Sequence, residues 1–146
     1  MNSEQIRLVQ DSFRRVMPIA DTAAELFYTR LFELDPRLKP LFKGDIAEQG
    51  RKLMQMIGMA VLSLRRLDQV LPALRALGAR HVRYGVRDGD YETVGRALLW
   101  SLKRGLGDSF TPEVEAAWAE VYATLAATMQ AGATTDAQAE ALAYAH

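Results

Sequence analysis

Apolar residues recur at intervals of three and four along almost the whole chain, and few stretches alternate as a β-strand would. The first such stripe predicts a helix that begins at Ser3, a candidate cap, and ends near Pro18. A second helix should end near Asp35-Pro36, because the residue before a proline disfavours helical backbone. The inner positions of this second helix are Ala23, Leu26, Phe27, Arg30, Leu31 and Leu34.

The middle of the chain continues the helical pattern after a short break. A helical turn through Pro36–Leu41 is followed by a loop over 42–45. A long helix with one apolar face comes next and breaks at Arg65-Arg66. Its apolar face carries Gln49, Leu53, Met56, Ile57, Ala60, Val61 and Leu64.

Three further segments complete the pattern. A stripe of Val70, Leu74, Leu77 and His81 ends at the turn residue Gly85. Asp90 is a candidate cap for the next helix, which Gly107 closes. Thr111-Pro112 is a strong helix start, a capping residue followed by proline at the first helical position.

One domain accounts for these elements. The chain has 146 residues, which suits a single domain with a real core, and no linker or repeat divides it. We expect an all-α domain of about seven or eight helices over residues 1–132. Residues 133–146 are rich in Ala, Thr and Gln, and we expect a tail that is a short helix or frayed.

Composition narrows the class of protein. With 18 basic and 18 acidic side chains, the formal net charge is zero, which argues against nucleic acid or an anionic membrane as a partner. The absence of cysteine excludes disulfides, thiolate metal sites, Cys-ligated iron–sulfur clusters and catalytic thiols. We find no secretory signal and no membrane-spanning stretch, and we expect a soluble cytoplasmic protein.

His81 is the residue with the most informative position. Only two histidines are present, and the other, His146, ends the chain. Because His81 shares a stripe with Leu77, it should point inward. It is either a core histidine satisfied by its neighbours or an axial haem ligand, for which one imidazole is enough because the porphyrin supplies four ligands. Zinc and di-iron sites need several converging ligands and are disfavoured.

Tyr28 and Gln49 are the other polar side chains placed toward the interior. Tyr28 follows Phe27 in the middle of its helix, and Gln49 lies on the inner edge of a later one. Tyr28 is either a packed core residue or a hydroxyl donor to a bound ligand. Gln49 is either a second donor or an ordinary surface or capping residue.

These residues belong to longer runs that resemble bacterial globins, namely the single-domain bacterial haemoglobins and the globin part of flavohaemoglobins. The similarity spans about residues 3–130, and its motifs fall in the family's order. The motifs are Leu26-Phe27-Tyr28-Thr29-Arg30-Leu31-Phe32, Asp35-Pro36, Pro40-Leu41-Phe42, Gln49 to Leu53, Leu77 to Val86 including His81, Tyr91, Val94-Gly95, Ala117-Trp118 and Val121-Tyr122. The resemblance implies a globin fold, a three-on-three helical sandwich that encloses one haem b.

The resemblance also implies a role for each matching residue. His81 corresponds to the proximal iron ligand, and Phe42 to the phenylalanine that wedges against the porphyrin. Tyr28, Gln49 and Leu53 correspond to the distal wall of a Tyr/Gln pocket. Residues in contact with the haem edge or proximal side are Arg80, Val86, Tyr91, Val94 and Tyr122. Lys52 corresponds to a partner of a haem propionate, with a solvated lysine as the alternative.

Two departures from the family matter. No histidine lies on the distal helix, which disfavours bis-histidine iron. Flavohaemoglobins carry a glutamate near the proximal histidine, and the matching position falls near Ala133, which we expect to lie beyond the end of the last main helix. Without that carboxylate the imidazole is a weaker electron donor, which disfavours peroxidase-like chemistry.

Three functions are compatible with these residues. The first is reversible binding, storage or scavenging of O2, or of NO or CO, at five-coordinate haem. The second is NO dioxygenase or nitrite reductase chemistry with an external reductase, because the sequence shows no flavin or nicotinamide domain. The third is a gas sensor or haem-free signalling module, which lacks a recognisable output domain here. Whichever function applies, we expect the protein to be a monomer or homodimer.

Overall fold

The computed structural model describes residues 1–42, 44–83 and 85–145, with all their side chains except those of Arg83 and 133–145. Within this part the regular structure consists of six α-helices and four short 3-10 helices, and no strand occurs. The prediction of an all-α fold is therefore confirmed. The α-helices number fewer than expected, because several of the short segments between them are 3-10 turns.

The helices follow one another with short connections. The α-helices are α1 (Ser3–Val16), α2 (Ala20–Leu34), α3 (Ile46–Leu62), α4 (Leu67–Arg83), α5 (Asp88–Leu106) and α6 (Pro112–Ala145). The 3-10 helices are η1 (Met17–Ile19), η2 (Pro36–Leu41), η3 (Leu64–Arg66) and η4 (Gly107–Ser109). The helical turn predicted before the loop at 42–45 coincides with η2.

Local capping chemistry fixes the start of α1. The Asn2 side chain accepts the N–H of Gln5 at 2.8 Å, and the Gln5 side chain accepts the N–H of Asn2 at 3.0 Å. This reciprocal pair is a capping box. The prediction that Ser3 caps the helix is wrong by one residue, because Asn2 competes for that position and its amide oxygen reaches the third helical N–H.

Capping also corrects the expected start of α5. The helix begins at Asp88, and Asp90 is its third residue rather than its cap. The Asp90 carboxylate still satisfies a terminal donor, since it accepts the N–H of Arg87 at 2.9 Å. At the other end of α5, Gly107 has a φ of +57°, which a glycine adopts without steric cost, and the helix stops there as predicted.

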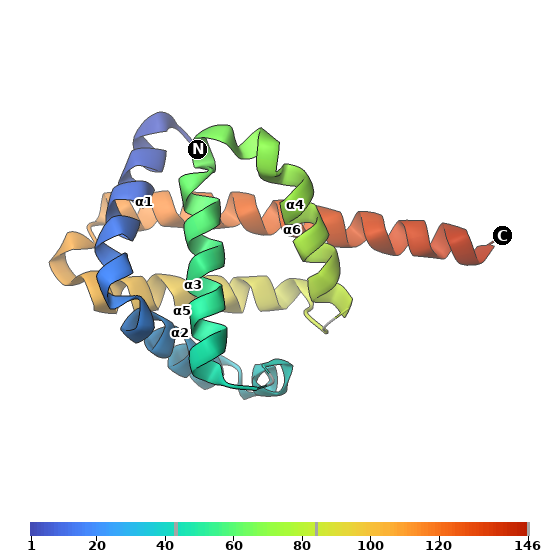
Figure 1. The fold of residues 1–146 in the computed structure, drawn as a ribbon, viewed down its shortest axis with the longest axis horizontal. Coiled ribbons are helices and arrows are strands. Elements are labelled where there is room, and N and C mark those ends of the chain that lie inside the picture. The colour runs from blue at the N-terminus through green and yellow to red at the C-terminus, as the bar shows by residue number, and fades with distance from the viewer. Residues whose placement is uncertain (43, 84, 146) are drawn as a thin grey trace.

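The helices are arranged in two crossing groups. In Figure 1, α5 and α6 lie together as a pair, and α1, α3 and α4 cross this pair in the same view. Helix α2 packs mainly on α5 and α3, whereas α4 packs chiefly on α6. The apolar stripes of α3 and α4 have no extensive packing against each other within the described part of the chain.

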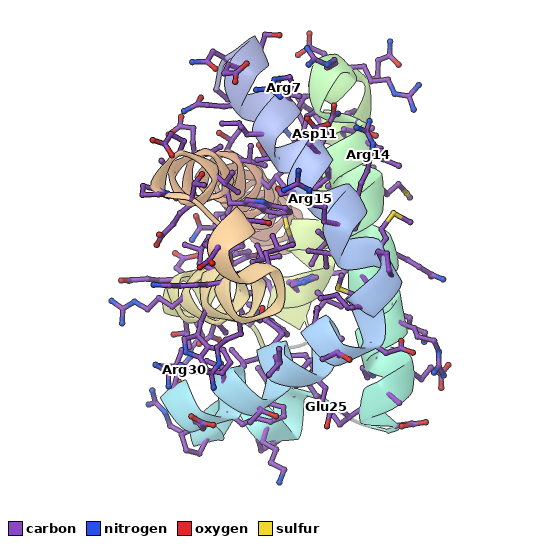
Figure 2. The ribbon with its side chains drawn as sticks, turned by 90° about the vertical axis from the view of Figure 1, so that its left-hand side faces the viewer. Arg7, Asp11, Arg14, Arg15, Glu25 and Arg30 are labelled. Carbon is purple, nitrogen blue, oxygen red and sulfur yellow. The ribbon has the colours of Figure 1, made fainter. Side chains whose placement is uncertain are left out.

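The outer face of α1 shows why only one side of a helix is apolar. Arg7, Asp11 and Arg14 lie together on the surface in Figure 2. Asp11 pairs with Arg14 at 2.7 Å and with Arg7 at 3.3 Å, and Arg7 also pairs with Glu4. Such exposed pairs contribute little to stability. They keep this face in water while the opposite face packs into the core.

The core is organised around Trp118 of α6, which is 2 % exposed. Its indole N–H donates to the Ser12 hydroxyl of α1 at 2.8 Å, and its ring lies 6.4 Å from that of Phe13. Ser12 in turn donates to a carbonyl of its own helix. A buried indole is therefore fully paired and joins the first helix to the last.

Helices α4 and α6 touch backbone to backbone at two glycines. A β-carbon at Gly78 of α4 would collide with the carbonyl group of Met129 of α6. A β-carbon at Gly132 of α6 would collide with the backbone of Arg75 of α4. Each helix thus supplies one glycine where the other helix comes closest, and no other residue fits at either point without moving the helices apart.

Helix α6 continues past this contact. Its backbone remains helical to Ala145, so that residues 133–145 extend α6. The prediction that the position near Ala133 lies beyond the last main helix is wrong for the backbone, because no proline or positive-φ glycine stops the helix after Gly132. The side chain at this position, and His146, lie outside the described residues.

The glycine contact makes a prediction about stability. Gly78→Ala should lower the free energy of unfolding by about 1–3 kcal/mol, because the added methyl group forces the two backbones apart. Urea denaturation followed by circular dichroism measures the change.

Gly89→Ala is the matched control, since Gly89 lies in α5 and a β-carbon there meets nothing within 4 Å. Alanine favours helix by up to about 1 kcal/mol over glycine, so this variant should be as stable as the wild type or more so. Equal stability of the two alanine variants would show that the α4–α6 contact has room to relax.

Candidate functional site

His81 lies near the end of α4 with its ring partly buried. Its Nδ1 is 2.8 Å from the carbonyl oxygen of Leu77, one turn earlier. Because a carbonyl can only accept, Nδ1 carries the proton, and the lone pair is on Nε2. Burial lowers the pKa of His81, with the positive charge of Arg80 acting in the same direction. The imidazole is therefore held neutral and in the tautomer that a metal ligand requires.

Two tyrosines, one beside the His81 ring and one bonded to the backbone of the first, follow on the next two helices. The Tyr91 ring of α5 lies 6.5 Å from the His81 ring and is inclined to it by 23°. The Tyr122 hydroxyl of α6 donates to the backbone carbonyl of Tyr91 at 2.5 Å. The Tyr122 ring passes over Gly95, where a β-carbon would lie 2.7 Å from Cε2 of that ring. Helices α4, α5 and α6 thus meet around one imidazole.

The Tyr91 hydroxyl is buried and has no hydrogen-bond partner among the described residues. Burial raises the pKa of Tyr91 and, more strongly, that of Tyr122, so both hydroxyls stay protonated. An unpaired buried hydroxyl is unusual and marks a place where a partner is missing. Sequence analysis placed Tyr91 near the haem but did not foresee this unpaired group.

Tyr28 lies in a second aromatic cluster, on α2. Its side chain is 4 % exposed, and its ring centroid is 5.1 Å from that of Phe27, 6.0 Å from that of Phe32 and 5.2 Å from that of Phe42. Burial raises the pKa of Tyr28 to about 12, which keeps the hydroxyl protonated and able to donate. The structure thus brings together Tyr28 and Phe42, two of the predicted site residues.

Helix α3 contributes the remaining residues of the predicted distal wall. Asp45 caps this helix and accepts the N–H of Ala47 at 2.9 Å. Gly50 allows α3 to cross α2 closely, since a β-carbon there would lie 2.9 Å from that of Ala24. Gln49, next to this crossing, and Leu53, one turn later, are both partly buried. The crossing also brings α3 close to Tyr28, since the same β-carbon would lie 3.8 Å from Cε2 of its ring.

The other predicted contacts are distributed around these two clusters. Val86 and Val94 are partly buried, near the start of α5 and within it. Arg80 is exposed, and so is Lys52, which lies 3.7 Å from Glu48 in an ion pair of neighbouring helical turns. Lys52 is therefore on the solvent side of α3, where a haem propionate or water could equally hold it. Tyr84 of the proximal run lies outside the described residues.

The packing between α3 and α4 fits a large flat apolar group. Both helices carry apolar stripes, yet few of their side chains are fully buried. Met56, expected on the inner stripe of α3, is 42 % exposed, and Leu74 and Leu77 on the stripe of α4 are only partly buried. In contrast, the apolar residues that α1 and α2 contribute to the core are almost completely buried. Haem inserted between α3 and α4 would cover this apolar surface and meet the free Nε2 of His81.

The donor set agrees with haem rather than with a metal held by protein alone. Among the described residues, no three His, Asp or Glu side chains converge as a zinc or di-iron site would need. Haem requires only one protein ligand, because the porphyrin supplies four, and His81 provides a suitable nitrogen. The described helices also include none that is long and apolar enough to span a membrane.

Comparison with known proteins places the chain in a family. The globin family model matches residues 25–129, which include His81 and both aromatic clusters. The chain belongs to the globin family. The resemblance inferred from the motifs is thereby confirmed, and so is the globin fold.

Curated relatives of this globin include longer proteins. It is 37 % identical over 107 residues to a flavohemoprotein of Chromobacterium violaceum, covering 70 % of this chain and 26 % of the relative. It is 29 % identical over 129 residues to a flavohemoprotein of Rhodopirellula baltica, covering 86 % and 32 %. The globin thus spans about a quarter to a third of the length of these relatives.

Solved structures with the same fold cover nearly the whole globin. A bacterial globin from Campylobacter jejuni has a TM-score of 0.82 at 24 % identity, covering 92 % of this chain and 97 % of the other. An engineered carbene transferase, made from a candidate nitric oxide dioxygenase of Rhodothermus marinus, has a TM-score of 0.83 at 25 % identity and 99 % coverage of both chains. At the level of the family, haem b as the cofactor is confirmed.

Besides the unpaired hydroxyl of Tyr91, three features of the site were not foreseen in the sequence. These are the Leu77 carbonyl as the partner of His81, and the glycines Gly78 and Gly95 that let neighbouring elements approach. The helical spacing of four residues between Leu77 and His81 could have indicated the first. A glycine inside a helical stripe is itself a sign of close packing, although it does not say what packs there.

The two tyrosine hydroxyls make a paired prediction. Tyr122→Phe removes the hydrogen bond to the Tyr91 carbonyl and should lower the free energy of unfolding by about 1 kcal/mol. Tyr91→Phe removes a hydroxyl that has no partner and should leave stability within about 0.5 kcal/mol of the wild type, or raise it. Urea denaturation of the two variants side by side measures the difference. A larger loss for Tyr91→Phe than for Tyr122→Phe would reveal an acceptor for the Tyr91 hydroxyl.

Proposed function

We propose that this globin binds O2 or another diatomic gas reversibly, at haem b held between α3 and α4 with His81 as its axial ligand. The observation that carries the proposal is the His81 ring, partly buried and hydrogen-bonded through Nδ1 so that Nε2 is available. When bound, the haem supplies a ferrous iron with one open position for the gas. The side chains of the protein must supply everything else that reversible gas binding requires.

On the proximal side, the chain holds a neutral imidazole without a carboxylate partner. Nδ1 of His81 donates to a neutral backbone carbonyl, and the described side chains place no Asp or Glu on it. The nearby Tyr91 hydroxyl has no acceptor among the described residues that could relay a charge. A weakly polarised imidazole favours reversible binding over peroxidase-like chemistry, which a strong electron donor promotes.

On the distal side, Tyr28 is the principal hydrogen-bond donor. Its ring is fixed among Phe27, Phe32 and Phe42, so the hydroxyl has little freedom to turn away. Gln49 supplies a second amide donor from α3. The surrounding aromatic side chains exclude water, which both strengthens the hydrogen bond to a polarised gas and slows oxidation of the iron.

The proposal is tested by visible absorption of the purified protein, ferric and reduced, before and after CO. The wild type should show a strong Soret band that shifts with CO. His81→Gly should lose the band or alter it, because no other described side chain occupies the position of the axial nitrogen.

Val82→Gly is the matched control for this variant. It places the same helix-weakening residue next to His81 on α4, at a position that is 49 % exposed. Its spectrum should be that of the wild type. The absence of a Soret band in the wild type after haem reconstitution would overturn the proposed function, and an unaltered band in His81→Gly would remove His81 from it.

The role of Tyr28 makes a kinetic prediction. Tyr28→Phe should speed O2 dissociation by at least about tenfold, since a hydrogen bond to a charged acceptor contributes about 1.5–3 kcal/mol. Stopped-flow displacement of O2 by CO measures the rate. CO itself is the control ligand, because it is a poorer hydrogen-bond acceptor and its own dissociation should change much less. An unchanged O2 rate would leave Tyr28 as a packing residue only.

A second function, conversion of NO and O2 to nitrate, is favoured by the comparisons. The relatives include flavohemoproteins and a candidate nitric oxide dioxygenase. Two distal hydrogen-bond donors would hold O2 tightly, and tightly held O2 suits this reaction. Each turnover consumes one electron, which a reductase would have to supply. NO consumption with and without an added flavin reductase distinguishes this activity from simple binding.

A further inference from the structure

A charged cleft opens between η2 and the start of α5. Its volume is about 340 Å³, near the lower end of the range for small-molecule pockets. The residues that line it are Asp35, Arg37, Arg87, Gly89, Asp90 and Thr93. None of these has been assigned a part in holding haem or gas, so the cleft needs an explanation of its own.

The acidic and basic side chains of the cleft differ in depth. The side chains of Asp90 and Asp35 are 8 % and 11 % exposed, whereas those of Arg87 and Arg37 are 66 % and 75 % exposed. The carboxylates therefore belong to the inner wall and the guanidinium groups to the outer rim. Two negative and two positive charges thus border the same space.

Asp35 and Arg37 form a complete pair on one side of the cleft. Asp35 accepts from Nε of Arg37 at 2.9 Å through Oδ1, and from Nη2 at 3.1 Å through Oδ2. These hydrogen bonds hold the pKa of Asp35 below its usual range, and the charge of Arg87 acts in the same direction. A two-bond pair of this kind is strong and fixed in geometry. It forms a rigid wall of the cleft.

Asp90 and Arg87, on the other side, are paired incompletely. Oδ2 of Asp90 accepts the backbone N–H of Arg87 at 2.9 Å. Oδ1 makes no hydrogen bond to the described residues, and Nη2 of Arg87 lies 3.8 Å from it. That distance is too long for a hydrogen bond. A carboxylate oxygen and a guanidinium group therefore both retain hydrogen-bonding capacity at the cleft.

The first turn of α5 adds backbone donors to the same place. The helix begins at Asp88, and the N–H groups of its first turn have no acceptor within the helix. Gly89 leaves this turn uncovered, because even a β-carbon there would meet nothing within 4 Å. The positive end of the helix dipole and Arg87 thus act together on the outer side of the cleft.

The distribution of charge selects the class of ligand. A simple anion would be attracted by the arginines and by the start of α5, but repelled by Asp35 and Asp90. A simple cation would be attracted by the carboxylates and repelled by the arginines. A molecule that carries an ammonium and a carboxylate group on one carbon atom meets an opposite charge at each end.

We propose that the cleft binds a small zwitterion of the α-amino acid class. Its ammonium group donates to Oδ1 of Asp90, and its carboxylate accepts from Arg87 and from the first turn of α5. The ligand thereby replaces one long ion pair with charge-assisted hydrogen bonds on both sides. No step of this inference needs haem, so that it stands independently of the proposed function.

Three probes of nearly equal size test the need for both charges. L-alanine carries both groups, L-lactate has a hydroxyl in place of the ammonium, and isopropylamine has a methyl in place of the carboxylate. Backbone amide shifts of the reduced, CO-saturated protein should change saturably with L-alanine at Arg37, Gly89 and Thr93. At equal ionic strength, the other two probes should bind at least about tenfold more weakly, because each loses a hydrogen bond between charged groups.

Variants of the incomplete pair test the same contacts from the side of the protein. Arg87→Gln and Asp90→Asn should each weaken the binding of L-alanine by at least about tenfold. The amide oxygen of Asn at position 90 can still accept the N–H of Arg87, which preserves the start of α5. Arg96→Gln is the matched control, since Arg96 is also on α5 and 69 % exposed but pairs with Glu92 and does not line the cleft. Circular dichroism shows that each variant is folded.

The outcomes decide the inference without reference to the Soret band. The absence of saturable shifts with L-alanine would overturn it. Equal binding of L-lactate or inorganic phosphate would show an anion site instead, and equal binding of isopropylamine a cation site. A loss in Arg96→Gln as large as that in Arg87→Gln would attribute the binding to general surface charge.

Discussion

The close contact between α4 and α6 is the constraint on which the site depends. Helix α4 carries His81, contains Pro72 within its length and packs chiefly on α6. The two glycines at the crossing, Gly78 and Gly132, remove the side chains that would otherwise hold the backbones apart. Gly78 lies three residues before His81, so the same contact that anchors the helix also fixes the position of the imidazole.

The rest of the pocket follows from close approaches of the same kind. Gly50 lets α3 cross α2 beside Tyr28, and Gly95 lets the Tyr122 ring lie against α5. The surroundings of His81 and of Tyr28 are therefore built by different helices, α4, α5 and α6 for the first and α2 and α3 for the second. Helices α3 and α4 are each fixed to other helices and pack little on one another. This arrangement leaves half-buried apolar surface that a flat cofactor covers.

The electrostatics of the two sides differ in a way that suits gas binding. Burial lowers the pKa of His81 and favours its neutral form, a backbone acceptor fixes its tautomer, and burial keeps the hydroxyl of Tyr28 protonated. No charged side chain among the described residues hydrogen-bonds to either group. The pocket thus offers one nitrogen to a metal and one donor to a ligand, and the surrounding aromatic and aliphatic groups strengthen both by excluding water.

Much of the fold could be predicted from periodicity and from a few stop signals. The proline after Asp35, the glycine at position 107 and the Thr111-Pro112 pair ended or began helices where expected, because their effects on the backbone are local. The caps predicted at Ser3 and Asp90 were wrong by one and three residues, respectively. Neighbouring polar residues compete for one cap, and only the backbone geometry decides between them.

The candidate residues of the site could be named from their types and order, since one inward histidine and a tyrosine within an aromatic run are visible in the sequence. Whether they meet depends on contacts between distant segments. The tautomer of His81, the unpaired hydroxyl of Tyr91 and the charged cleft between η2 and α5 are properties of packing among several helices. The sequence by itself determined the helices and their apolar faces, because these depend on residues three or four positions apart. Only the tertiary structure decided which faces approach closely, because that depends on where glycines on different helices coincide.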